Sequence, residues 1–347
     1  MSERTAGQPV DWYWLPIERE ALAALTRKSD VRGALQTFGF LGILALTGSA
    51  AWYSAERWPW FVTGALLFLH GTGWAFLSNG FHEFSHGTVF ATRGLNRAFL
   101  YVFAFLGWNN LVLFWASHSD HHKFAMYPDD DLEEGLYVKP TLRDFLLSAV
   151  INPLGLYRSI KGTLRHARGH IEGRWEQHLF PDSRPEQQHR LRTCAWMILS
   201  GHAAIIAVAI YFKLWLLPVV ITLAPFYGGG IQWLCNQTQH AGLPLAVPDF
   251  RLCSRTIYLN PLLQFLYWHM NFHTEHHIYA AVPCYRLARL HRLVKEDMPP
   301  CPRGLLATWL QINRTLQRQK VEPGHEYYAN VPPRRARATA TRGALPR

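Results

Sequence analysis

The sequence predicts an all-α integral membrane protein, with four transmembrane helices plus interfacial helices and a helical cap on the cytoplasmic side. Two observations carry this prediction. Hydrophobic residues make up 49% of the 347 residues, and they gather in four segments of about the 20 residues that a helix needs to cross a bilayer. Between and after these segments lie polar stretches that contain short, regularly spaced histidine clusters.

The four predicted crossings are residues 36–54, 60–79, 193–211 and 215–235. A fifth apolar stretch, residues 98–116, contains Gly107, Asn109 and Asn110. If it crossed completely, the histidines before and after it would lie on opposite faces of the membrane. We therefore expect this stretch to be re-entrant or interfacial, so that all the clusters lie on one side.

The basic residues predict which side that is. Lysine and arginine total 35 against 24 acidic residues, for a net charge of +11. They flank the first crossing and fill the segment between the second and third, and short cytoplasmic loops are enriched in these residues. We expect an integral protein of a bacterial inner membrane, with its active site and both termini in the cytoplasm. No cleavable signal peptide is expected, because the first 30 residues are polar.

The chain divides accordingly into three predicted parts. Residues 1–34 form a cytoplasmic N-terminal segment, residues 35–300 the membrane domain with its cytoplasmic cap, and residues 301–347 a cytoplasmic C-terminal segment that ends in a basic disordered tail. The arginines of that tail do not predict nucleic-acid binding, because they stand in a short proline-containing end. The five cysteines have no CxxC spacing and predict reduced thiols.

Four histidine clusters carry the chemistry. Within each, residues recur at i, i+3 or i+4, so on a helix they project from one face. Neutral imidazole is a good ligand for iron, zinc, copper and nickel. Nine imidazoles are too many for one ion and enough for two. The candidate metal ligands are His82, His86, His118, His121, His122, Asn236, His240, His273, His276 and His277.

Other histidines have plainer interpretations. A single HxxxH occurs by chance, whereas two HxxHH clusters beside hydrophobic segments do not fit ordinary core histidines. His70 and His202 lie alone within apolar segments, and we expect each to form a hydrogen bond with a neighbouring helix. His166, His170, His178 and His189 lie in a polar stretch and are expected at the surface.

In order, spacing and relation to the apolar segments, the clusters resemble those of the membrane fatty acid desaturase superfamily, over roughly residues 35 to 300. The stretch from Asn271 to Pro283 carries much of this resemblance. The resemblance implies a diiron site that activates O2, with His240 as a direct ligand and Asn236 approaching one iron through water. The first cluster is HxxxH and not HxxxxH, and the third begins with His273 where many front-end desaturases have Gln.

A metal-bound imidazole usually donates its remote N–H to a nearby acceptor. Glu83, Asp120 and Glu275 stand inside the clusters and are candidates for this role. The acidic run at residues 129–134 is favoured as a solvated loop. The alternative is that Asp129 or Asp130 orients a ligand or meets a polar group of the substrate.

The resemblance implies an O2-dependent desaturase of a fatty acyl chain, an oxidoreductase that reduces O2 to water. A hydroxylase of the same superfamily, or a desaturase of a small metabolite such as an amino acid derivative, stays open. The expected partners are a membrane lipid or acyl substrate and a separate electron donor of ferredoxin or cytochrome type, since no cytochrome b5 module is fused to the chain. A metal transporter is disfavoured, because its polar residues would line a path across the bilayer. The sequence does not predict the oligomeric state.

Overall fold

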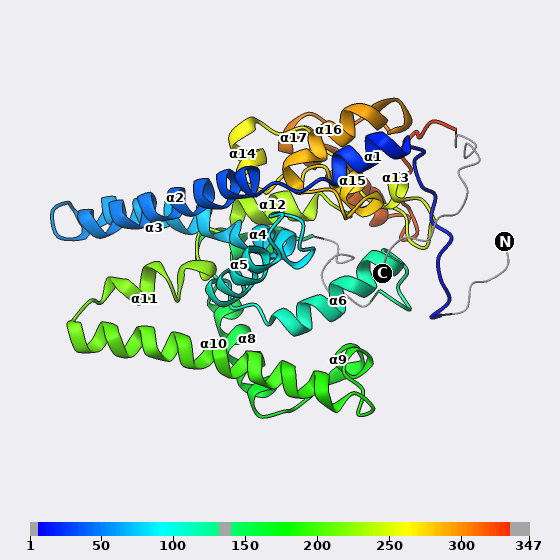
Figure 1. The fold of residues 1–347 in the computed structure, drawn as a ribbon. Helices are drawn as coiled ribbons and strands as arrows, with labels where there is room; N and C mark the ends of the chain where they lie inside the picture. The colour runs from blue at the N-terminus through cyan, green and yellow to red at the C-terminus, as the bar shows by residue number, and fades with distance from the viewer. Residues whose placement is uncertain (1–5, 132–139, 334–347) are drawn as a thin grey trace.

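The computed structural model describes residues 6–131 and 140–333, and every regular element within them is a helix. Figure 1 shows two long helical arms that project toward the same side of the molecule. One is the hairpin of α2 (Asp30–Ala55) and α3 (Trp60–Ala75); the other is α10 (Pro185–Phe212) with the short α11 (Leu216–Val220). The cap lies at the opposite end.

The remaining helices build the cap and connect it to the arms. In chain order they are α1 (Arg19–Thr26), α4 (Leu77–Ser85), α5 (Arg93–Leu106), α6 (Leu111–Phe124), α7 (Leu142–Ala149), α8 (Pro153–Ala167), α9 (Gly173–Leu179), η1 (Ala224–Phe226), α12 (Gly230–Gln237), α13 (Phe250–Cys253), α14 (Pro261–Leu266), α15 (His273–Ile278), α16 (Cys284–Val294), η2 (Lys295–Asp297) and α17 (Gly304–Gln319).

Among the described residues, three helical segments are long and apolar enough to cross a membrane: Asp30–Ala55, Trp60–Ser85 and Pro185–Phe212. They coincide with the first, second and third predicted crossings. The pair α5 and α6 would make a fourth if counted as one bent span. The prediction of an all-α protein with several candidate membrane helices is confirmed in this form.

The surfaces of the arms fit an apolar environment. Leu46 on α2 is 72% exposed, Trp60 on α3 is 85% exposed and Tyr211 on α10 is 80% exposed. Large apolar side chains exposed in this way are costly in water, and their concentration on a surface marks contact with a membrane or a partner. Because these residues lie along the long helices, a bilayer would surround the arms.

The prediction of a fourth continuous crossing at residues 215–235 is wrong. This segment is divided into α11, η1 and α12. The break has a local cause at Gly228, whose φ is +71°. A Cβ there would stand 2.7 Å from the carbonyl oxygen of Phe68 and from the nitrogen of Thr72, both on α3. Only glycine adopts this conformation so close to another backbone.

The apolar stretch at residues 98–116, predicted to be re-entrant or interfacial, is bent and is not one continuous helix. Helices α5 and α6 meet at 106° across a four-residue break. Asn110 begins α6 by accepting hydrogen bonds from the backbone N–H groups of Val112 and Leu113. Because of this bend, the histidines of α6 lie next to those of α4.

The core beneath the histidines is rich in aromatic rings. The indole of Trp268 is fully buried and packs edge-on against Phe40, Phe84 and Phe103. The absence of a side chain at Gly80 on α4 admits this indole, since a Cβ there would lie 2.6 Å from it. Close packing of this kind fixes α4, and with it the first histidine cluster.

Candidate metal centre

The predicted histidine clusters meet in the cap, although they come from distant parts of the chain. The first lies on α4 and its C-terminal cap, the second on α6 and the third on α15. His240 follows α12 in a turn. In each helix, the i, i+3 and i+4 spacing aims the rings of one cluster to one side.

The nine histidines divide into two groups. Within each group the candidate ligand atoms lie within 4.8 Å of one another. We call them the first group and the second group. The first group contains His82, His86, His118, His122 and His276, and the second group contains His121, His240, His273 and His277.

Ring nitrogens in both groups face one another at close range. In the first group, the Nε2 atoms of His86 and His118 are 3.1 Å apart, and those of His276 and His122 are 3.2 Å apart. In the second group, Nε2 of His277 lies 3.2 Å from Nε2 of His121 and 3.0 Å from Nε2 of His273.

The outer nitrogens decide which tautomers are present. Nδ1 of His240 lies 2.7 Å from the carbonyl oxygen of Cys253, which can only accept, so Nδ1 carries the proton. Nδ1 of His121 lies 2.7 Å from Asp131 Oδ2, and Nδ1 of His82 lies 3.1 Å from Glu83 Oε1. Because Nδ1 of each of these rings carries the proton, Nε2 is unprotonated, and its lone pair points toward the other rings of the group.

Two unprotonated Nε2 atoms that face each other cannot form a hydrogen bond, but both can bind one metal ion. Nε2 of His240 lies 2.9 Å from Nε2 of His273, and Nε2 of His82 is buried with no hydrogen-bond partner. Two nitrogens bound at right angles to one ion, with bonds of about 2.1 Å, would stand about 3.0 Å apart. The observed separations match, so each group fits one ion of the class that imidazole prefers.

The electrostatics of the cap favour neutral rings. Burial, reinforced by neighbouring histidines, lowers the pKa of His240 to about 3. The same two causes hold the pKa values of His273, His276 and His277 well below the usual range. Metal binding needs unprotonated imidazole, and these rings are already in that form at neutral pH.

The acceptors around the rings are only partly those expected. Glu83 is confirmed beside a ligand candidate, and its Oε1 also lies 3.7 Å from Nδ1 of His276. Within the described part of the acidic run, Asp131 lies against His121, whereas the alternative prediction named Asp129 or Asp130. Glu133 and Glu134 of that run lie outside the described residues.

Two other predicted acceptors have different partners. Glu275 accepts from Nδ1 of His291 at 2.5 Å, and Nε2 of His291 lies 2.8 Å from the Tyr258 hydroxyl. Asp120 accepts from Lys123 at 3.1 Å and from His178 at 3.3 Å. In the described part of the chain, both carboxylates therefore accept from groups other than the nine candidate ligands, and the acceptor role predicted for Asp120 and Glu275 is wrong.

Asn236 lies on α12 and is joined to α4 by a side-chain bond. Its Oδ1 accepts a hydrogen bond of 3.1 Å from Nδ2 of Asn79. Asn79 stands one turn before His82, so this bond ties the cluster of Asn236 and His240 to the first cluster. Asn79 was not among the predicted site residues, although its spacing of three residues before His82 puts both on one helix face.

The isolated histidines of the apolar segments behave as expected. Nε2 of His70 lies 2.9 Å from the Val220 carbonyl oxygen, and Nε2 of His202 lies 3.1 Å from that of Phe105. The prediction of a surface position is wrong for His166, which is buried against Glu176. The same carboxylate accepts from Arg165, so the site is an ion-pair cluster of the cap.

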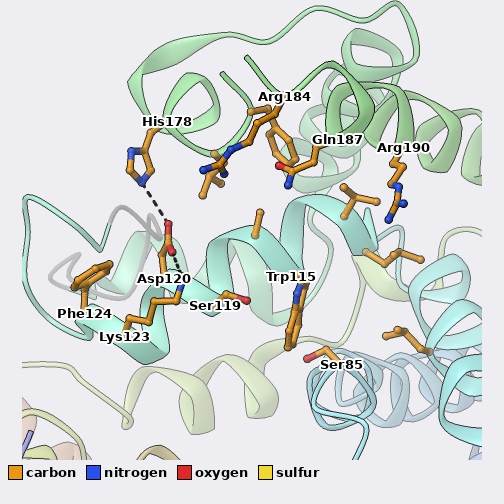
Figure 2. Close-up of a pocket in the computed structure, with 16 residues that line it drawn as sticks. Ser85, Trp115, Ser119, Asp120, Lys123, Phe124, His178, Arg184, Gln187 and Arg190 are labelled. Carbon is orange, nitrogen blue, oxygen red and sulfur yellow. Dashed lines mark hydrogen bonds and ion pairs between the residues drawn. The ribbon is translucent and has the colours of Figure 1, made fainter. Parts of the chain in front are cut away.

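The two groups differ in exposure. All four histidines of the second group are buried, whereas His86 and His122 of the first group are partly exposed. Beside the first group lies a pocket of about 550 Å³ (Figure 2), which we call the α6–α10 pocket. It is lined mainly by α6, α9 and the start of α10, with Ser85 of α4 at its edge. The first group is therefore the accessible one.

Comparison with known families gives one match. The profile of the fatty acid desaturase family matches residues 56–306, more than half of the chain. The matched region includes all four clusters. A comparison with curated proteins found no match.

Proposed function

Since the chain belongs to the fatty acid desaturase family, we propose that it is an O2-dependent enzyme that introduces a double bond into a fatty acyl chain with two iron ions. The first group would hold one ion. The second group would hold the other, and Asn236 would approach one of the two ions through water. The gathering of nine imidazoles into two compact groups, in a chain of this family, carries the proposal.

Bound iron would supply the activation of O2 and the removal of hydrogen from an unactivated C–H bond. In the proposed reaction, two adjacent methylene groups lose two hydrogen atoms, and O2, two electrons and two protons complete the formation of two water molecules. The substrate is oxidised and O2 is reduced. The electrons come from a separate donor of ferredoxin or cytochrome type.

The protein itself orients the ligands and limits access of water. Asp131, Glu83 and the carbonyl oxygen of Cys253 accept the outer N–H groups of three rings. Such contacts fix the ring orientation and raise the basicity of the inner nitrogen. The burial of the second group keeps solvent from that side of the centre.

The proposal includes an orientation. The arms would span a bacterial inner membrane, and the cap with both termini would lie in the cytoplasm. The distribution of lysine and arginine supports this orientation. An acyl chain in the bilayer would then meet the cap at the membrane surface.

The test compares the wild-type chain with His276→Ala, and with His189→Ala as a control at an exposed histidine outside both groups. Each variant is expressed in host cells, its metal content is measured, and the host lipids and small metabolites are analysed by mass spectrometry. We expect two irons per chain and a product about two mass units lighter than a host acyl chain for the wild type and the control. His276→Ala should lose the first-group ion and the product.

Each other outcome has a stated meaning. A product about sixteen units heavier would replace desaturation by hydroxylation. A lighter small metabolite in place of an acyl chain would move the assignment to a specialised substrate. Wild-type product from His276→Ala would overturn the proposal.

A further inference from the structure

The α6–α10 pocket has two unlike walls (Figure 2). On α10 and just before it, Arg184, Gln187 and Arg190 recur every three residues, so their side chains line one face of the helix start. On α6 the first half of the opposite wall is apolar, with Leu111, Val112, Trp115 and Ala116, and the second half carries Ser119, Asp120 and Lys123. One wall suits a polar or anionic group, and the apolar half of the other suits a hydrocarbon chain.

The apolar wall leads to the first group. Ser85 at the edge of the pocket directly precedes His86. The ring of Trp115 lies 6.4 Å from the ring of His86, and the indole is 50% exposed. A chain lying along α6 over Trp115 would therefore pass beside the accessible group of histidines.

The charges of the pocket leave one cation available. Asp120 is already engaged by Lys123 and His178. Arg190 donates to Glu186 at 2.6 Å. Arg184 is exposed at the N-cap of α10, makes no side-chain capping bond, and has no ion-pair partner among the described residues.

We propose that the α6–α10 pocket binds a single-chain amphiphile by its anionic head, with Arg184 as the residue that selects for negative charge and Trp115 as the contact for the chain. The proposal rests on the proposed function, because it treats this amphiphile as the substrate. The shared chemistry is a carboxylate or phosphate head on one apolar chain. An anionic head would form a charge-assisted hydrogen bond with the guanidinium of Arg184.

The size of the pocket agrees with this occupant. A volume of about 550 Å³ lies in the range of about 300 to 1,000 Å³ that small-molecule sites have. A head group and the adjoining part of a chain fill such a space, and the rest of the chain would continue toward the first group. A neutral lipid would use the apolar wall alone and gain nothing from Arg184.

Binding is measured on the iron-loaded full chain in neutral detergent, by displacement of a fluorescent neutral acyl probe. The competitors are palmitate, a lysophosphatidic acid with the same chain, methyl palmitate and hexadecyltrimethylammonium. The variants are Arg184→Glu, Trp115→Ala and Arg314→Glu. Arg314 is exposed on α17, so its substitution changes the net charge equally at a distant place.

In the wild type we expect an anionic competitor to bind about tenfold more tightly than the methyl ester, a difference that shrinks at high salt. Comparison of palmitate with lysophosphatidic acid shows whether the head is a carboxylate or a phosphate. Arg184→Glu should abolish the preference for negative charge, while Arg314→Glu should keep it. Trp115→Ala should weaken the ester and the anions alike.

Equal affinity of the wild type for anionic and neutral competitors would overturn the proposal, as would equal effects of Arg184→Glu and Arg314→Glu. Tighter binding of the cationic competitor would also overturn it. Because the readout is binding, its failure is separate from failure of the reaction. Charge-selective binding without any oxidised product would contradict the proposed function but would still support the binding role proposed for the α6–α10 pocket.

Discussion

His121 shows how one ring is fixed from both ends. Its Nδ1 meets Asp131, while its Nε2 faces His277 across the second group. Asp131 Oδ2 also accepts from the backbone N–H of Met126, so the carboxylate is itself held in place. The orientation of this candidate ligand thus depends on Asp131, a residue outside both histidine groups.

Replacing Asp131 by Asn should weaken metal binding in the second group by about 10- to 100-fold, because the ring loses its anionic acceptor. The measurement is a competition between the protein and a chelator of known affinity. Asp129→Asn is the matched control, since Asp129 is exposed in the same run. If both variants held metal equally well, the role assigned to Asp131 would be wrong.

The spacing of histidines in the sequence predicted more of the site than of its surroundings. The nine histidines were candidates because helical periodicity puts i, i+3 and i+4 on one face, although His240 lies in the turn after α12 and not on a helix. The outer contacts were harder to predict, because they join separate elements. Neither Asn79 beside Asn236 nor the Cys253 carbonyl beside His240 has a pattern in the sequence that links the two partners.

At the scale of elements, the break between α11 and α12 is the main departure from the predicted fold. The apolar composition of residues 215–235 predicted a helix that crosses the membrane. The backbone of Gly228 instead presses against α3 at a positive φ. A hydropathy profile contains no information about close contacts between two backbones. The three consecutive glycines at 228–230 were the feature of the sequence that indicated a possible break in the helix.

Gly228→Ala should therefore lower the stability of the folded protein by about 1–3 kcal/mol, because a Cβ there combines an unfavourable φ with a clash against α3. Thermal unfolding in detergent measures the effect as a lower melting temperature. Gly162→Ala on α8 is the control, since a Cβ at that position meets nothing within 4 Å. Equal melting temperatures for the two variants would show that the contact with α3 is unimportant.

At the scale of the whole molecule, the arms and the cap define two sides. The turn between α10 and α11 at Lys213 lies at the far end of an arm, and α17 belongs to the cap (Figure 1). In the proposed orientation, a membrane-impermeant thiol reagent should label Lys213→Cys from outside the cell. It should label Arg314→Cys only after the membrane is opened.

The parent chain is labelled in parallel, since Cys301 is partly exposed while the other four cysteines are buried. Labelling of both introduced cysteines from the same side would contradict a cap and an arm end separated by the bilayer. Labelling of Arg314→Cys alone from outside would reverse the proposed orientation.

The unequal burial of the two histidine groups should give their metal ions different rates of exchange. With the two proposed ions bound, an ion in the first group would leave past the partly exposed His86 and His122, whereas an ion in the buried second group would leave only when the cap opens locally. Exchange of bound metal for an isotope of the same metal should show a fast and a slow phase of equal amplitude. A single phase would mean that both ions share one exit.

The slow phase would also constrain biogenesis. A chain folded without metal should take up its first ion readily and its second only at the rate of local unfolding. The inner ion would then be acquired while the protein is still being assembled, and the supply of metal at that moment would set how much finished protein is complete.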